Sequence, residues 1–189
     1  LVTVARWLAS GARTVFLQDG NTPVMRTPEL VVVLTYLKQN FPTVERVTSY
    51  GRAKTAAHKS LEEWKAIKEA GLSRLHLGLE SGCDEVLQFM DKGVTAQEQA
   101  LGGRKVVEAG ISLSEYVMPG LGGRRWSEKH ARDTAWVLNQ VNPDFIRLRS
   151  LIVRQDSLLH DRLLAGEFEV LPEDEVIAEL RLFVENLDC

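Results

Sequence analysis

Cysteine and long apolar runs are scarce in this 189-residue sequence, and each shortage excludes a class of protein. The two cysteines, Cys83 and Cys189, are too few for a disulfide framework or a self-contained zinc site. No apolar run approaches the roughly 20 residues of a membrane-spanning helix, and the opening residues are not typical of a signal peptide. We therefore expect a soluble, cytoplasmic protein that has no membrane partner.

Charge of one sign is also scarce. The sequence has 23 basic and 26 acidic residues, a formal net charge of -3, and no block of like charge. A nucleic-acid partner is therefore not expected, because proteins that bind nucleic acid usually carry a basic patch. Hydrophobic residues make up 44% of the chain, which is enough for a buried core, and we predict a single domain over residues 1–189.

The sequence repeats one unit, which consists of a helix that ends at glycine, an apolar strand, and a loop that contains glycine. The unit is seen in ASGARTVFLQDGN, EAGLSRLHLGLESG and EAGISLSEYVMPGLGG, where Gly11, Gly71 and Gly110 occupy the expected left-handed helix ends. Strands that alternate with helices favour parallel strands joined by right-handed crossovers. Further strands are predicted at residues 44–50 and 145–149, and further helices near residues 127–141 and 173–187.

Three helix starts are visible in the sequence. Thr27 precedes Pro28, an arrangement typical of a cap residue followed by proline in the first helical turn. Ser60 and Thr95 are each followed three residues later by glutamate, which is the spacing of a capping box. We therefore expect helices to begin at these three points.

The pattern predicts an α/β fold, a partial parallel (β/α) barrel of about five to six strands. Five strands are recognisable in the sequence, too few to close the usual eight-stranded barrel. Because Leu1 falls within what the sequence indicates is a helix, we expect the domain to be truncated at its N-terminus, with the first strand missing. A sheet without its first strand exposes an edge, so the truncated chain is expected to be open to self-association.

Glycine and polar residues follow each predicted strand. In parallel α/β folds ligands bind at the carboxyl ends of the strands, so these residues form the candidate ligand site. Their acceptors, donors and close backbone approach suit a small zwitterionic molecule that carries a sugar. The alternative is that the glycines only form turns. The candidate residues are Asp19, Gly20, Asn21, Ser49, Arg52, Glu80, Ser81, Met118, Pro119, Gly120, Arg147 and Arg149.

Strand alternation separates two faces of the segment RLHLGLES. His76 and Glu80 alternate with leucines, so the leucines are expected to pack on helices while Glu80 points into the barrel. An inward carboxylate is costly unless it is satisfied. Arg147 and Arg149 share a face of another strand, and Glu115 lies within a third. These charges either form internal salt bridges that fill the barrel or bind a ligand, with an arginine on its carboxylate and Glu80 on its ribose or amino group.

Several of these segments resemble the radical S-adenosylmethionine (SAM) enzymes. The resemblance depends on the ordered segments FLQDGN and LGLESG, the stretch from Tyr116 to Gly123, and PDFIR. Its most specific part is GLESGCDEVLQFMDKGVT, in which a glutamate-serine loop is followed by a short helix and Lys-Gly. The similar branch comprises oxygen-independent coproporphyrinogen oxidases, methylthiotransferases and elongator-type proteins, and the likeness covers nearly the whole chain.

The resemblance implies which residues bind SAM as a cofactor. Residues 19–21 take the place of the family's Gly-Gly-Glu-type turn, which holds the SAM ammonium group, although Asp-Gly-Asn stands here instead. Glu80 and Ser81 lie where the family contacts the ribose and the methionine part. Residues 118–120 match the segment against which the adenine rests.

The resemblance also implies a 4Fe-4S cluster held by three cysteines at C-x3-C-x2-C spacing. The sequence has no such triplet, so we expect the cluster ligands upstream of Leu1 and no metal ligand in this chain. The full-length protein is then expected to be an iron-sulfur oxidoreductase that forms a 5′-deoxyadenosyl radical from SAM, while the chain alone is inactive. No histidine has the spacing of a metal site or a catalytic triad, and His76 is expected to face the interior.

Two alternatives to a radical enzyme stay open at this point. One is a non-redox α/β barrel that binds a phosphate-bearing or nucleotide-like small molecule. The segment GLGGRR, residues 120–125, resembles a phosphate cradle but lacks the Lys-Ser/Thr ending of a P-loop. The other is a catalytically inactive binding module. An upstream cysteine triplet and SAM cleavage would distinguish the radical enzyme from both.

Overall fold

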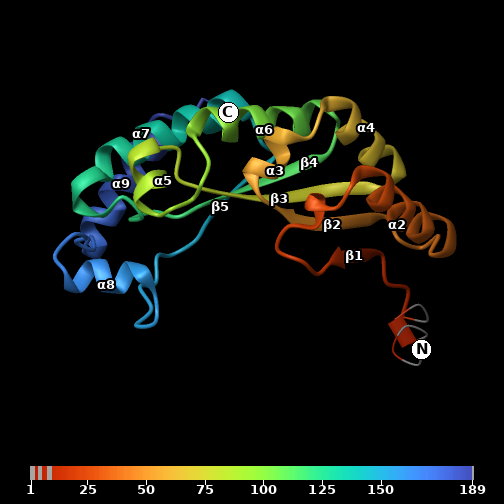
Figure 1. The fold of residues 1–189 in the computed structure, drawn as a ribbon, viewed down its shortest axis with the longest axis horizontal. Helices are drawn as coiled ribbons and strands as arrows, with labels where there is room; N and C mark the ends of the chain where they lie inside the picture. Colours follow the sequence, from red (N-terminus) through yellow and green to blue (C-terminus); the bar gives the residue numbers. More distant parts are fainter. Residues whose placement is uncertain (1–2, 4–5, 8–9, 189) are drawn as a thin grey trace.

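The computed structural model describes residues 3, 6–7 and 10–188, and its central feature is one parallel β-sheet (Figure 1). Within these residues the sheet has five strands, in the order in which they occur along the chain, and it is not closed into a barrel. All four strand pairings are parallel. The strands are β1 (Thr14–Leu17), β2 (Arg46–Gly51), β3 (Leu72–Glu80), β4 (Ser112–Val117) and β5 (Phe145–Leu148). The prediction of a partial parallel α/β barrel is confirmed.

Helices connect the strands, and Figure 1 shows α4, α6 and α7 in a row along one side of the curved sheet. The described helices are the 3-10 helix η1 (Thr22–Val24) and the α-helices α2 (Thr27–Asn40), α3 (Ala53–His58), α4 (Leu61–Ala70), α5 (Asp84–Phe89), α6 (Ala96–Glu108), α7 (Gly123–Val141), α8 (Leu158–Leu164) and α9 (Glu173–Glu185). None of these helices has the length and apolar character needed to cross a membrane.

The core lies between the sheet and the helix row. Leu75, Leu77 and Leu79 of β3 are at most 1% exposed, and they belong to one hydrophobic cluster with Trp64 of α4 and Leu138 of α7. Residues between these leucines must point to the opposite face, because successive side chains in a strand alternate. The predicted division of β3 into a leucine face and a polar face is therefore correct.

Two of the three predicted helix caps have the expected geometry. Ser60 and Thr95 each form a complete capping box with the glutamate three residues later. Thr27 does not cap α2, because Arg26 occupies the cap position. The hydroxyl of Thr27 instead donates to Glu63 over 2.6 Å and accepts from Lys59 over 2.8 Å. The Thr27 side chain, which the local pattern assigns to the helix cap, is thus used in a contact with residues more than 30 positions away.

Paired glycines in α6 allow unusually close helix packing. A Cβ atom on Gly102 would lie 2.8 Å from the backbone nitrogen of Ala57 in α3, and one on Gly103 would lie 2.7 Å from Val141 in α7. Glycine in a helix interior costs about 1 kcal/mol relative to alanine. Here the absence of a side chain lets α6 fit between its two neighbours.

Candidate functional site

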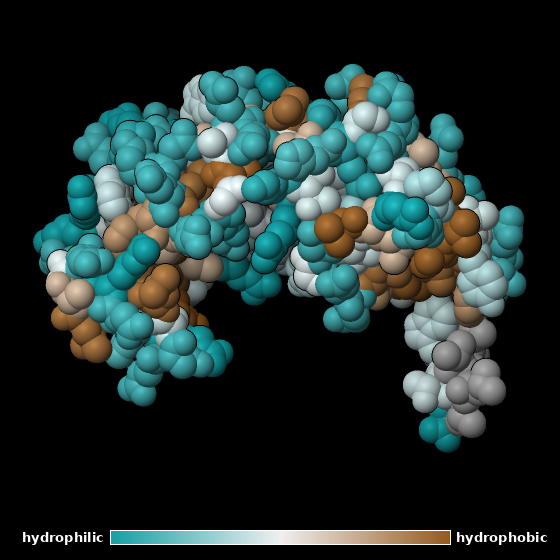
Figure 2. Space-filling model, in the orientation of Figure 1, coloured by the Kyte–Doolittle hydropathy of each residue, from teal (hydrophilic) through white to brown (hydrophobic). Residues whose placement is uncertain are grey.

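A cavity of about 520 Å³ opens where β2, β3 and β4 end, on the polar face of β3. Figure 2, in the orientation of Figure 1, shows the molecule arched over an open hollow. The volume lies within the usual range of small-molecule sites. Five predicted site residues line the cavity, namely Gly20, Arg52, Glu80, Met118 and Arg149. Within the described part of the chain, the other seven predicted site residues do not line this cavity, namely Asp19, Asn21, Ser49, Ser81, Pro119, Gly120 and Arg147.

Glu80 is held at the mouth of the cavity by an unusual backbone conformation and an ion pair. Its φ angle is 61°, a left-handed value that is uncommon for a residue with a side chain, and the strand register shifts just before it. The carboxylate lies 2.5 Å from the Lys92 ammonium. A Cβ atom on Gly78 would lie 3.1 Å from a Glu80 carboxylate oxygen, so glycine there leaves room for this side chain. Strain of this kind is concentrated at functional sites.

The Asp-Gly-Asn turn is fixed by the amide of Asn21. Its Oδ1 atom accepts from the backbone N–H of Arg52, and its Nδ2 atom donates to the Thr55 hydroxyl, both over 3.0 Å. These bonds connect the loop after β1 to the start of α3. Gly20 lines the cavity, and Asp19 is exposed to solvent. The Asn21 amide is occupied by its bonds to Arg52 and Thr55.

Ser81 is fully buried and bonded to the protein. Its Oγ atom lies 2.8 Å from Nδ1 of His130 and accepts from the backbone N–H of Cys83 over 3.0 Å. The other ring nitrogen, Nε2, lies 3.2 Å from the carbonyl oxygen of Met118. A carbonyl only accepts, so Nε2 carries the proton and Nδ1 accepts from the serine. Burial lowers the pKa of His130, which keeps the ring neutral in this network.

The loop after β4 is tied to α9. The backbone N–H of Gly120 donates to Glu179 over 2.7 Å, and the Glu179 side chain is 2% exposed. Met118 lies in the cavity at the start of this loop. The two ends of the predicted adenine segment therefore differ: Met118 lines the cavity, whereas Gly120 is hydrogen-bonded to α9.

Ser49 and Arg147 lie beside the site without lining the cavity. Ser49 is 1% exposed, and its hydroxyl donates to the carbonyl of Tyr50 over 2.9 Å. Arg147 is exposed on β5. The positive charge of Arg147 nevertheless reaches His76 at the bottom of the cavity, where burial first and then this charge lower the pKa of His76 to about 4.

Glu115 faces the helices and not the cavity. It pairs with Leu77 in the parallel register, it is 1% exposed, and its carboxylate approaches Gly103 of α6. Burial raises the pKa of Glu115 to about 8. Within the described residues Glu115 forms no salt bridge. It therefore does not take part in the internal salt bridges that were one of the two expectations for these charges.

Comparison with known proteins shows the family. The sequence model of the radical SAM superfamily matches residues 1–135. The chain belongs to this superfamily. Curated relatives include two proteins named tRNA uridine(34) acetyltransferase. That of Methanocaldococcus jannaschii is 22% identical over 117 residues, and that of Methanocaldococcus infernus is 23% identical over 119 residues. These matches cover 61% and 62% of this chain but 22% of each relative, so the chain spans about a fifth of their length.

Solved structures of radical SAM enzymes share the fold. An N-terminally deleted Elp3 from Methanocaldococcus infernus superposes with a TM-score of 0.71 and 15% identity, over 96% of this chain and 48% of that one. Coproporphyrinogen III oxidase (HemN) from Escherichia coli superposes with a TM-score of 0.70 and 12% identity, over 91% of this chain and 39% of that one. At this identity the likeness establishes the fold.

The donor set of the cavity fits SAM. A carboxylate from Glu80, cations from Arg52 and Lys92, and the apolar side chain of Met118 all border one space. Ribose hydroxyls donate to carboxylates, a ligand carboxylate pairs with a cation, and a flat base packs on an apolar side chain. Lys92 was not among the site residues predicted from the sequence. The Lys-Gly pair in the segment GLESGCDEVLQFMDKGVT could have pointed to it.

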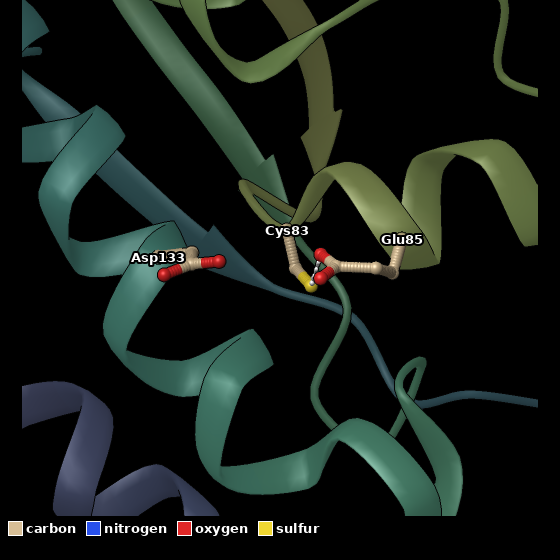
Figure 3. Close-up of side chains that lie close together, drawn as sticks. All are labelled: Cys83, Glu85 and Asp133. Carbon is tan, nitrogen blue, oxygen red and sulfur yellow. Dashed lines mark hydrogen bonds between the residues drawn. The ribbon is translucent and has the colours of Figure 1, made fainter.

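The described residues do not fit a 4Fe-4S cluster, which needs several cysteine thiolates. Cys83, at the start of α5, donates through its sulfur to Glu85 over 3.2 Å, and burial raises its pKa to about 11. Figure 3 shows it beside Glu85 and Asp133, a group that has the donor types of a metal site. The Lys129 ammonium already lies 3.0 Å from Glu85 and 2.5 Å from Asp133. A protonated thiol and a resident cation account for this group without a metal.

Proposed function

We propose that this chain forms the SAM-binding core of a radical SAM enzyme, with SAM in the cavity where β2, β3 and β4 end. The proposal is supported above all by the convergence of Glu80, Arg52 and Met118, from three different strand ends, on one cavity. A carboxylate, a cation and an apolar surface are the groups that the ribose, amino-acid part and adenine of SAM require.

Each lining residue has a distinct role in this proposal. Glu80 accepts from the ribose hydroxyls while Lys92 holds its carboxylate in place. Arg52 pairs with the SAM carboxylate, and Met118 packs on the adenine. Gly20 lets the turn after β1 approach the ligand closely. The chain therefore positions SAM.

We further propose that the cluster ligands lie in residues outside this sequence, because the sequence has only two cysteines. When bound, SAM and a reduced 4Fe-4S cluster would supply the chemistry of a 5′-deoxyadenosyl radical toward a substrate. The oxidoreductase activity is thus assigned to the full-length protein. The proposal includes no acetyl transfer, because the matches cover only 22% of the acetyltransferases.

The alternative of a phosphate-binding barrel has less support from the site. Arg124, in the glycine-rich segment considered as a phosphate cradle, is paired with Glu169 over 2.8 Å and with Glu175 over 3.0 Å. A cation with two carboxylate partners is poorly placed to receive a phosphate. The cavity at the strand ends therefore remains the better candidate for the ligand.

The test is SAM binding to the full-length protein, measured by isothermal titration calorimetry without oxygen. We expect Glu80→Gln to weaken SAM binding by about tenfold or more, which corresponds to about 1.4 kcal/mol per factor of ten. Glu128→Gln is the matched control, because Glu128 is exposed on α7 and pairs only with Arg132 in the described residues. Wild-type affinity in a folded Glu80→Gln variant would contradict the assignment.

A further inference from the structure

Four aromatic side chains from four neighbouring strands lie side by side with their rings tilted by 44–57° to one another, and we call this group the aromatic floor. Phe16 of β1, Tyr50 of β2, His76 of β3 and Tyr116 of β4 make up this floor. Ring centroids are 4.8 Å apart for Phe16 and Tyr50, 5.6 Å for Tyr50 and His76, and 5.7 Å for His76 and Tyr116. Tyr50, His76 and Tyr116 line the same cavity as Glu80.

Two cations stand at one edge of the aromatic floor. The Arg149 guanidinium lies 4.8 Å from the ring centre of Tyr116 and donates to its hydroxyl over 3.4 Å. Arg147 is on the adjoining strand β5, in register with Tyr116. Among residues 3, 6–7 and 10–188, no carboxylate lies within 4.0 Å of either guanidinium. This edge of the floor is therefore positively charged and able to receive an anion.

His76 adds a polar atom to the floor but no charge. His76 is only 6% exposed, and its Nδ1 atom has no hydrogen-bond partner among the described residues. Burial and the nearby arginines lower the pKa of His76 to about 4, so the ring is neutral at pH 7. A buried polar atom without a partner is costly unless a ligand or water satisfies it.

We propose that the aromatic floor binds the substrate as a planar, π-bearing group and that Arg147 and Arg149 bind its anionic substituent. This inference builds on the proposed function, since it places the substrate beside SAM in one cavity. Tilted rings offer faces and edges on which another aromatic ring can pack, and guanidinium groups bind carboxylates and phosphates. Nucleotides and aromatic carboxylic acids share this chemistry.

The experiment is calorimetric titration of the full-length protein, saturated with SAM, with four probes. Uridine 5′-monophosphate and 4-hydroxybenzoate carry both a ring and an anion, and neither contains the adenine of SAM. Uridine lacks the anion and ribose 5-phosphate lacks the aromatic ring. We expect uridine 5′-monophosphate or 4-hydroxybenzoate, or both, to bind about tenfold more tightly than uridine and ribose 5-phosphate. The tighter of the two shows whether the substrate is a nucleotide or an aromatic acid.

Two variants test the two parts of the floor separately. Tyr50→Leu should weaken every ring-bearing probe about tenfold. Arg149→Gln should weaken only the probes that carry an anion, so that uridine 5′-monophosphate and uridine bind alike. Arg154→Gln is the control, because Arg154 is exposed and paired with Asp156 away from the cavity. Circular dichroism confirms that each variant is folded.

The outcomes separate this inference from the proposed function. If SAM binds but no probe does, the aromatic floor is not a substrate site while the SAM assignment stands. If the probes compete with SAM, or if Arg149→Gln weakens SAM as strongly as the probes, the floor belongs to the SAM site and the inference is wrong. If SAM itself does not bind, the proposed function fails first.

Discussion

The Oε1 atom of Glu179, on α9, lies 2.7 Å from the backbone nitrogen of Gly120 and accepts its hydrogen bond. The second carboxylate oxygen accepts from the Ser127 hydroxyl over 2.5 Å. The carboxylate and Gly120 are both buried, while Ser127 is partly exposed. The last long helix of the described chain therefore holds the loop that carries Met118 into the cavity.

Removing this carboxylate should affect both stability and the site. We expect Glu179→Ala to lower the free energy of unfolding by roughly 1–3 kcal/mol, since the buried N–H of Gly120 loses its acceptor. SAM binding should weaken several-fold, because the loop at Met118 loses its support. Urea unfolding and calorimetry measure the two effects. Glu185→Ala is the control, because its partner Arg181 is exposed on the same helix. Equal stability of both variants would contradict this account.

A second prediction concerns Ser81. We expect Ser81→Ala to lower the free energy of unfolding by roughly 1–3 kcal/mol, because the N–H of Cys83 loses its acceptor and Nδ1 of His130 keeps only the Thr134 hydroxyl, 3.4 Å away. SAM affinity should change less than it does in Glu80→Gln, since the hydroxyl points away from the cavity. Thermal unfolding and SAM titration of the two variants give the comparison. A large loss of SAM affinity at unchanged stability would instead support the prediction that Ser81 binds SAM.

Local patterns predicted the fold and the part of the site that depends on a single strand. Helix caps such as Ser60 and the alternation of β3 depend on residues a few positions apart, so the direction of His76 and Glu80 could be read from the sequence. The carboxyl ends of parallel strands meet at one edge of a sheet, which is why Arg52 and Met118 were found.

Other predicted site residues do not line the cavity, because their contacts come from distant segments. The partners of Ser81 and Gly120 are 49 and 59 residues away, and no local pattern reveals them. Tyr50 and Tyr116 were not selected, since aromatic residues are common in any strand. Their ring centroids lie 6.4 Å apart only because of the registers of β2 with β3 and of β3 with β4.

The close packing of α6 leads to a prediction for Gly103. Alanine favours a helix by about 1 kcal/mol over glycine, but its Cβ atom would lie 2.7 Å from Val141. We expect Gly103→Ala to lower the free energy of unfolding by roughly 1–3 kcal/mol because of this overlap. Adding Val141→Ala should recover part of the loss, which a double-mutant cycle measures. Additive effects of the two substitutions would show that they do not meet.

The buried carboxyl of Glu115 should make stability depend on pH. Burial raises its pKa from 4.5 to about 8, so the folded chain keeps a proton that the unfolded chain releases. Stability from this group is therefore fully present below about pH 4.5 and is lost as the pH rises through 8. Glu115→Gln should remove this slope and raise the free energy of unfolding at pH 7 by roughly 1–3 kcal/mol. Urea unfolding between pH 5 and 8 tests this, with the exposed Glu108→Gln as the control. An unchanged slope in Glu115→Gln would mean that another group titrates.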